Sequence, residues 1–115
     1  MTKTAITALK ITADGEVTDV EIPAGDFLQT AYAQINCRAV DVVTLTSRLD
    51  MWLDDEGLVN GSVLNAPATF LAREYGRTHQ SYAGTVLLTE HNAEGDTTSL
   101  GPELRQVVLD VLLAV

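Results

Sequence analysis

The fold of this chain is decided by residues 5–22, which read AITALKITADGEVTDVEI. Side chains alternate from Ala5 to Ile11 in the pattern of a strand with one buried face. Asp14-Gly15 favours a tight hairpin turn, because both residue types tolerate the positive φ angles that such turns use. Val17–Ile22 then forms the returning strand. The chain therefore opens with an antiparallel β-hairpin.

Outward from this hairpin, helical and strand patterns alternate along the chain. The first expected helix is capped by Asp26 and has Leu28, Ala31, Tyr32 and Ile35 on its inner face. Two strands follow, over Ala39–Leu45 and at Met51–Leu53. The remaining expected elements are a helix capped by Asn65, a strand over Gly84–Thr89, a polar loop over Asn92–Asp96 and a helix that begins at Pro102. The valine-rich strand over Ala39–Leu45 is expected at the sheet centre, covered on both faces. The order β-β-α-β-β-α-β-α predicts an α+β fold, a mainly antiparallel sheet of about five strands with helices packed on one face.

Length and composition indicate one domain over residues 1–115. The 46% of hydrophobic residues suits a globular chain of this length, which needs no metal or disulfide to fold. Sixteen acidic against seven basic residues give a net charge of −9. Nucleic acids require positive charge, so we expect no nucleic-acid partner.

Cysteine usage and hydropathy indicate the compartment. Cys37 is the single cysteine, which excludes an intrachain disulfide. The chain shows no basic, apolar leader, and its longest apolar segment, Val107–Val115, is broken by Asp110 and too short to span a bilayer. We therefore expect a cytoplasmic protein without membrane contact. Few lysines and abundant alanine and valine suit a GC-rich genome.

The densest acidic cluster, Asp54-Asp55-Glu56-Gly57, is termed the acidic turn. A hard divalent cation would accept carboxylate ligands, but the spacing does not match a calcium-binding loop. Adjacent carboxylates in a turn also point in different directions. We therefore interpret the segment as a solvated turn that places glycine at its tight position.

Histidine and cysteine positions offer little catalytic or metal-binding chemistry. His79 and His91 lack the paired spacing of a zinc site, and Cys37 would have to complete an improvised ligand set. A nucleophile–base pair of Cys37 with either histidine has no local sequence support, and a small buried thiol is the simpler interpretation. We expect no metal, no cofactor and no catalytic residue, so the protein is interpreted as not an enzyme.

Two features could contact a partner. Trp52 is interpreted as packed in the core, with an exposed anchor as the alternative, because tryptophan is enriched at binding hot spots. The acidic turn and the loop from Asn60 to Asn65 form the expected contact region. The candidate interaction residues are Trp52, Asp54, Asp55, Glu56, Asn60 and Asn65.

Four short segments together resemble a known family. They occur in the order Ala39–Val43 (AVDVV), Asp54–Leu58 (DDEGL), Asn65–Thr69 (NAPAT) and Gly84–Leu88 (GTVLL). This succession is similar to the domain-of-unknown-function family 3846, small proteins of phages, plasmids and other mobile elements. The resemblance implies a mobile-element setting, here with an actinobacterial host, and it implies no activity or catalytic residue.

Two functional hypotheses follow. The first is an accessory protein of a phage or plasmid that binds a protein partner. Such a protein could act in counter-defence or by DNA mimicry. The alternative is a protein that binds or sequesters a small anionic ligand such as a nucleotide. A pocket containing Arg38, Arg73 or Arg77 would favour this alternative, because anions need cations.

The C-terminal helix predicts self-association. Its core-facing stripe consists of Leu104, Val107, Val108, Val111, Leu112 and Val115. Leu109 and Leu113 fall on the opposite side and form a second apolar ridge. A symmetric homo-oligomer would cover this ridge, and burial within the same chain is the alternative.

Overall fold

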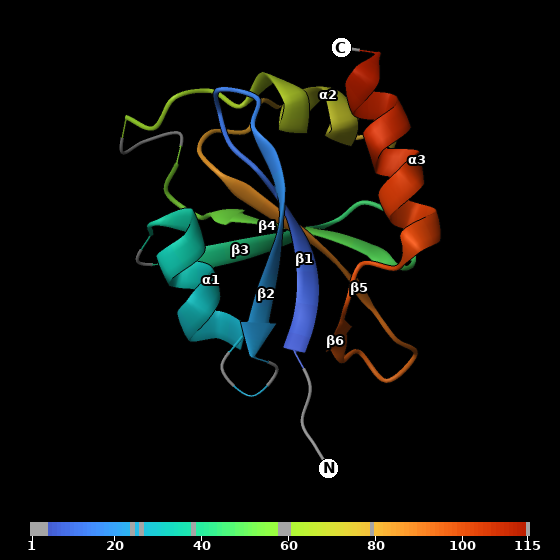
Figure 1. The fold of residues 1–115 in the computed structure, drawn as a ribbon. Helices are drawn as coiled ribbons and strands as arrows, with labels where there is room; N and C mark the ends of the chain where they lie inside the picture. The colour runs from blue at the N-terminus through green and yellow to red at the C-terminus, as the bar shows by residue number, and fades with distance from the viewer. Residues whose placement is uncertain are drawn as a thin grey trace.

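The computed structural model describes residues 5–23, 25, 27–37, 39–57, 61–78 and 80–114. Its elements are β1 (Ala5–Ile11), β2 (Val17–Pro23), α1 (Phe27–Ile35), β3 (Val40–Thr44), β4 (Leu49–Asp54), α2 (Ala66–Glu74), β5 (Val86–His91), β6 (Thr97–Thr98) and α3 (Pro102–Leu113). The strands form one sheet in the order β2-β1-β5-β4-β3, with β6 paired to β5 (Figure 1). The α+β class, the antiparallel sheet and the order of the long elements are confirmed; the two-residue strand β6 was not expected.

The opening hairpin forms as its sequence predicts. β1 pairs with β2 over its whole length, from Ala5 opposite Pro23 to Ile11 opposite Val17. Gly15 has φ 94°, a left-handed conformation that glycine adopts without steric penalty. The hairpin thereby fixes the register of one edge of the sheet.

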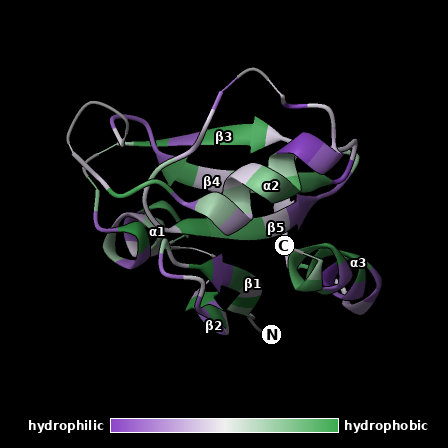
Figure 2. Cartoon of the chain, turned by 90° about the horizontal axis from the view of Figure 1, so that it is seen from above, coloured by the Kyte–Doolittle hydropathy of each residue, from purple (hydrophilic) through white to green (hydrophobic). Residues whose placement is uncertain are grey.

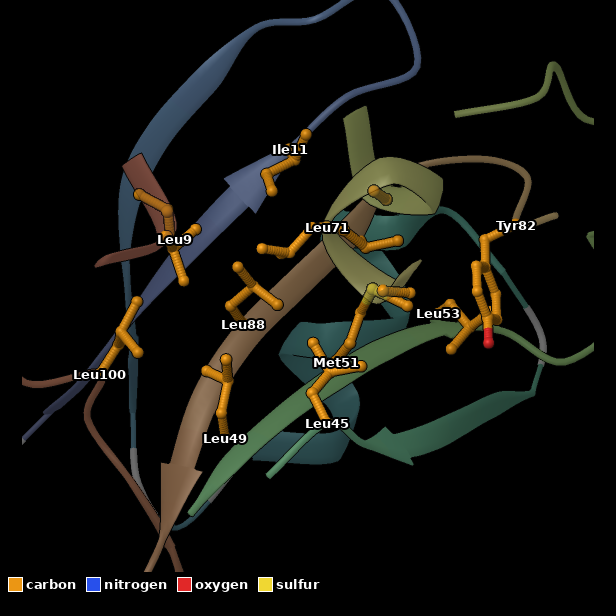
Figure 3. Packing of buried hydrophobic residues seen from close by; sticks show 14 residues of the cluster. Leu9, Ile11, Leu45, Leu49, Met51, Leu53, Leu71, Tyr82, Leu88 and Leu100 are labelled. Atoms are coloured by element: carbon orange, nitrogen blue, oxygen red, sulfur yellow. The ribbon is translucent and has the colours of Figure 1, made fainter. Parts of the chain in front are cut away.

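Strand alternation divides the apolar side chains between two cores. On β5, Leu88 belongs to the larger cluster and Leu87 to the smaller one, and on β4 Met51 and Trp52 are divided in the same way. Helix α2 packs on the larger cluster, with Leu71 among its members (Figure 3), and α3 packs on the same cluster. Helix α1 covers the smaller cluster on the opposite face. The expectation that all helices share one face is therefore corrected. Because β4 and β5 are buried on both faces, the sheet needs cover on both sides.

The valine-rich strand β3 forms an edge of the sheet, as Figure 2 shows. Its residues are half-buried or exposed, so the expectation of a central, doubly covered strand was wrong. The interior strands are β1, β5 and β4. Valine favours extended backbone wherever its side chain packs on one side, so its abundance does not distinguish edge from centre.

Helix α1 buries a slightly different stripe from the one expected. Phe27, Ala31 and Ile35 are buried, whereas Leu28 is 50% exposed and was wrongly placed on the inner face. The helix ends before Asn36, whose φ of 63° breaks the helical conformation, as expected. The proposed cap Asp26 lies outside the described residues.

Helix α3 packs mostly with the stripe that its periodicity suggested, and two of its residues depart from the expectation. Val108 is buried, and Leu104, Leu109, Val111 and Leu112 pack against the larger core. Leu113 is 84% exposed, and Val107 is also exposed. The assignment of Leu109 to an outer ridge, and of Val107 to the core stripe, is therefore corrected. Leu104, Val108, Val111 and Leu112 confirm the expected core stripe, and Leu113 confirms the exposed side.

Candidate functional site

The acidic turn follows β4 and is built around backbone contacts. Asp54 is buried, and its Oδ1 accepts the Glu56 N–H at 2.9 Å. The Gly57 N–H donates to the Asp54 carbonyl at 3.1 Å. A Cβ on Gly57 would meet the Ala83 carbonyl oxygen at 2.9 Å, so glycine is required by close approach. The turn interpretation is confirmed, and Asp55 is the acidic residue that it exposes.

Asn65, expected at the surface, is completely buried. Its Oδ1 accepts the Ala68 N–H at 3.0 Å and so caps α2. Its Nδ2 donates to the carbonyls of Ile11 at 3.1 Å and Gly84 at 2.8 Å. The expected cap is confirmed, but the expected contact with a partner is corrected, because every polar atom of the side chain faces the chain's own backbone. Asn60 lies outside the described residues.

The residues just before Asn65 are apolar and exposed. Val63 is 71% and Leu64 56% exposed. Beside them a hollow of about 320 Å³ opens on the outer side of α2. It is lined by Leu64, Ala66, Thr69, Phe70, Arg73 and Ser81, and we term it the apolar hollow.

A second depression adjoins the apolar hollow and is acidic. Its volume is about 210 Å³, and we term it the acidic cleft. It is lined by Asp41, Val43, Leu53, Asp54, Asp55, Gln80, Ser81, Tyr82 and Ala83. Ser81 lines both depressions, so they lie next to each other. Burial raises the pKa of Tyr82.

Trp52 lies elsewhere. It belongs to the α1-covered core, where its ring meets that of Phe27 edge to face, with centroids 4.8 Å apart. Its indole N–H donates to Thr89 Oγ1 at 2.9 Å. The structure therefore places Trp52 in packing and does not bring it to the acidic cleft, so its candidacy as an exposed anchor is corrected.

A polar cluster that the sequence did not suggest joins β4 to β5. The Asp50 carboxylate is buried and lies 2.9 Å from Nδ1 of His91. Beside it, Arg48 binds Oε1 of Glu90 at 2.8 Å, and Oε2 of Glu90 accepts the Gly101 N–H at 2.7 Å. A carboxylate on Nδ1 orients an imidazole as in general-base sites. In the part of the chain that the structure describes, no hydroxyl or thiol hydrogen-bonds to this ring.

The other reactive candidates also lie apart. Burial, with the nearby Asp54, raises the pKa of the Cys37 thiol, the opposite of an activated nucleophile. His79 and Arg38 lie outside the described residues. Arg77 donates to the Thr44 carbonyl at 2.7 Å, whereas Arg73 lines the apolar hollow. Among the described positions, no three histidine, cysteine or acidic side chains are grouped to hold a metal ion.

Taken together, the chain is a small α+β protein with a twisted antiparallel sheet, helices on both faces and an exposed apolar–acidic surface at one side. It belongs to the family described as a domain of unknown function, DUF3846, whose model matches residues 6–112. No curated protein and no solved structure matches the chain. No helix within the described ranges is long and apolar enough to cross a membrane.

Proposed function

We propose that this protein acts by binding a protein partner through the apolar hollow and the acidic cleft. The observation that carries the proposal is the exposure of Val63 and Leu64 beside the hollow. Adjacent large apolar side chains at a hollow mark a contact surface more often than isolated ones do. Two parts of the expected contact region, the loop before Asn65 and the exposed Asp55, belong to this binding surface. Asn65 itself is buried and holds the backbone next to the surface in place.

The chemistry of the surface supports a binding protein rather than an enzyme. The apolar hollow and the acidic cleft contain no nucleophile–base pair within the described residues, and the Asp50–His91 pair lines neither of them. The net charge of −9 opposes phosphate-rich ligands and favours a basic protein partner.

The surface also favours one mode of binding over another. An exposed edge strand can bind a partner by strand addition, and β3 is such an edge. However, Asp41 Oδ1 accepts the Val42 N–H at 2.8 Å, and Arg77 occupies the Thr44 carbonyl. Because side chains already satisfy these edge groups, strand addition would first have to displace them. Docking onto the outer side of α2 requires no such exchange.

The proposed setting is the cytoplasm of an actinobacterium that carries a phage or plasmid. The partner would be a host protein or one encoded by the mobile element. Counter-defence is one version of this function. DNA mimicry is another, in which the acidic surface occupies a DNA-binding protein.

The experiment is affinity capture from a lysate of the natural host, read by mass spectrometry. Immobilised wild-type protein is compared with Leu64→Asp and with Leu28→Asp, a control on α1 that is similarly exposed. We expect one partner to bind the wild type and the control equally and the Leu64 variant at least about tenfold less. Equal capture by folded Leu64→Asp would contradict the proposed site.

A further inference from the structure

We propose that the partner presents a segment that is both apolar and basic. A large apolar side chain would enter the apolar hollow, and a lysine or arginine a few residues away would lie over the acidic cleft. This inference rests on the proposed function, and it adds the chemistry of the ligand and its orientation on the surface.

The acidic cleft supplies the charge argument. Asp41 and Asp55 are exposed, and Asp54 completes three carboxylates along the lining. The described lining residues of the cleft include no lysine or arginine. Asp41 uses Oδ1 to accept the Val42 N–H, and no salt bridge within the described residues pairs Asp41 or Asp55 with a cation. A basic side chain would therefore gain charge-assisted hydrogen bonds with Asp41 and Asp55.

The apolar hollow supplies the second half of the argument. Leu64, Ala66 and Phe70 provide apolar walls, and Arg73 is its one described charged lining residue. A cation inserted here would meet Arg73 and lose hydration without gaining a carboxylate. The part of the ligand in the hollow is thus apolar, and the basic part is confined to the cleft.

Ser81 links the two halves, because it lines both depressions. One short segment can therefore occupy both at once, which holds the second contact at high effective concentration after the first has formed. Complementary charge then selects the orientation of the segment, while the apolar contact contributes most of the affinity. A uniformly basic or uniformly apolar segment would use only half of the surface.

The test uses a phage-displayed library of random peptides of about twelve residues, a length that suits a short docking segment. Selection is made on the wild-type protein, with counter-selection on Leu64→Asp. We expect the enriched peptides to carry a large apolar residue with a lysine or arginine within about four positions. Enrichment of neutral or acidic peptides would overturn the inference and leave the proposed function standing. Failure of any peptide to prefer the wild type over Leu64→Asp would count against both.

An enriched peptide is then synthesised and its affinity measured by calorimetry. Asp41→Asn with Asp55→Asn should weaken binding by about tenfold at low salt, because both replacements keep the shape and remove the charge. Glu21→Gln with Glu94→Gln is the control, since it changes net charge equally at exposed positions outside both depressions. Replacing the peptide's basic residue by glutamine should give the same loss without altering the protein. Unchanged affinity in both tests would refute the charge contact.

Discussion

Leu64 and Asn65 are neighbours in the chain, and their burial is the reverse of what is usual for an apolar and a polar residue. The asparagine is fully buried, whereas the leucine is 56% exposed. Asn65 is buried because each of its amide groups meets a backbone partner from β1, from α2 or from the segment before β5. Leu64 makes one isolated bridge with Ala83 and leaves its side chain at the apolar hollow. The comparison separates a residue that holds the fold from a residue that is available to a ligand.

The largest expected effect is that of Asn65→Ala. The substitution removes the cap of α2 and leaves the carbonyls of Ile11 and Gly84 without their amide donor. We expect a loss of about 3–5 kcal/mol in the free energy of unfolding, because one helix cap is lost and one buried and one partly buried carbonyl lose their donor. Chemical denaturation measures this change directly.

Leu64→Ser is the matched control for Asn65→Ala. It should change the free energy of unfolding by less than about 0.5 kcal/mol, as exposed substitutions usually do. A large destabilisation by Leu64→Ser, or a small one by Asn65→Ala, would break the distinction between the two positions.

Helix α3 offers the same comparison on a smaller scale. Leu109 packs against the larger core, whereas Leu113 is exposed. Leu109→Glu should therefore destabilise the protein by about 2 kcal/mol, because a carboxylate would replace a partly buried apolar side chain. Leu113→Glu should leave thermal unfolding nearly unchanged.

Self-association through α3 is a separate prediction, and its apolar contacts would come from the exposed Val107 and Leu113. Sedimentation equilibrium at tens of micromolar should show a dimer for the wild type and a monomer for Leu113→Glu. A monomeric wild type would contradict self-association without affecting the assignment of Leu109 to the core.

The sequence predicted the features that depend on local chemistry. The hairpin at Asp14-Gly15 and the cap at Asn65 were both predicted, because each follows from the conformations and hydrogen bonds of adjacent residues. The glycine of the acidic turn was also predicted, although the structural reason for it is the close approach of the Ala83 carbonyl. Leu109 could not be placed, because α3 has apolar residues on more than one side and the choice between them is made by tertiary packing.

The candidate site was predicted only in part, for the same reason. The loop before Asn65 and the exposed Asp55 were expected, but the apolar hollow requires residues from α2 and Ser81 to meet. The pairing of Asp50 with His91 depends on the neighbouring placement of β4 and β5. Asp50 and His91 are polar residues in strands that are otherwise largely buried. Because buried polar groups need hydrogen-bond partners, this feature could have indicated the pair.

The smallest expected effect concerns an exposed pair that joins α3 to β2. Arg105 donates from Nε and Nη2 to the two carboxylate oxygens of Asp19, at 2.9 and 2.8 Å. These hydrogen bonds hold the pKa of Asp19 below its ordinary value. A carboxyl group whose pKa is lower in the folded state stabilises the fold above its unfolded pKa, and this contribution is lost as pH falls through the folded pKa.

The coupling between Asp19 and Arg105 should therefore be present at neutral pH, begin to fall near pH 4, where free aspartate becomes protonated, and disappear only below the lower folded pKa. A double-mutant cycle with Asp19→Asn and Arg105→Gln measures it by denaturation at pH 7 and at pH 3. Both side chains are largely exposed, so water and salt screen the pair, and the coupling should also shrink in 1 M salt. A coupling that persists both at pH 3 and in 1 M salt would mean that Asp19 contributes through packing rather than charge. The attachment of α3 would then depend on its apolar residues, Leu109 foremost.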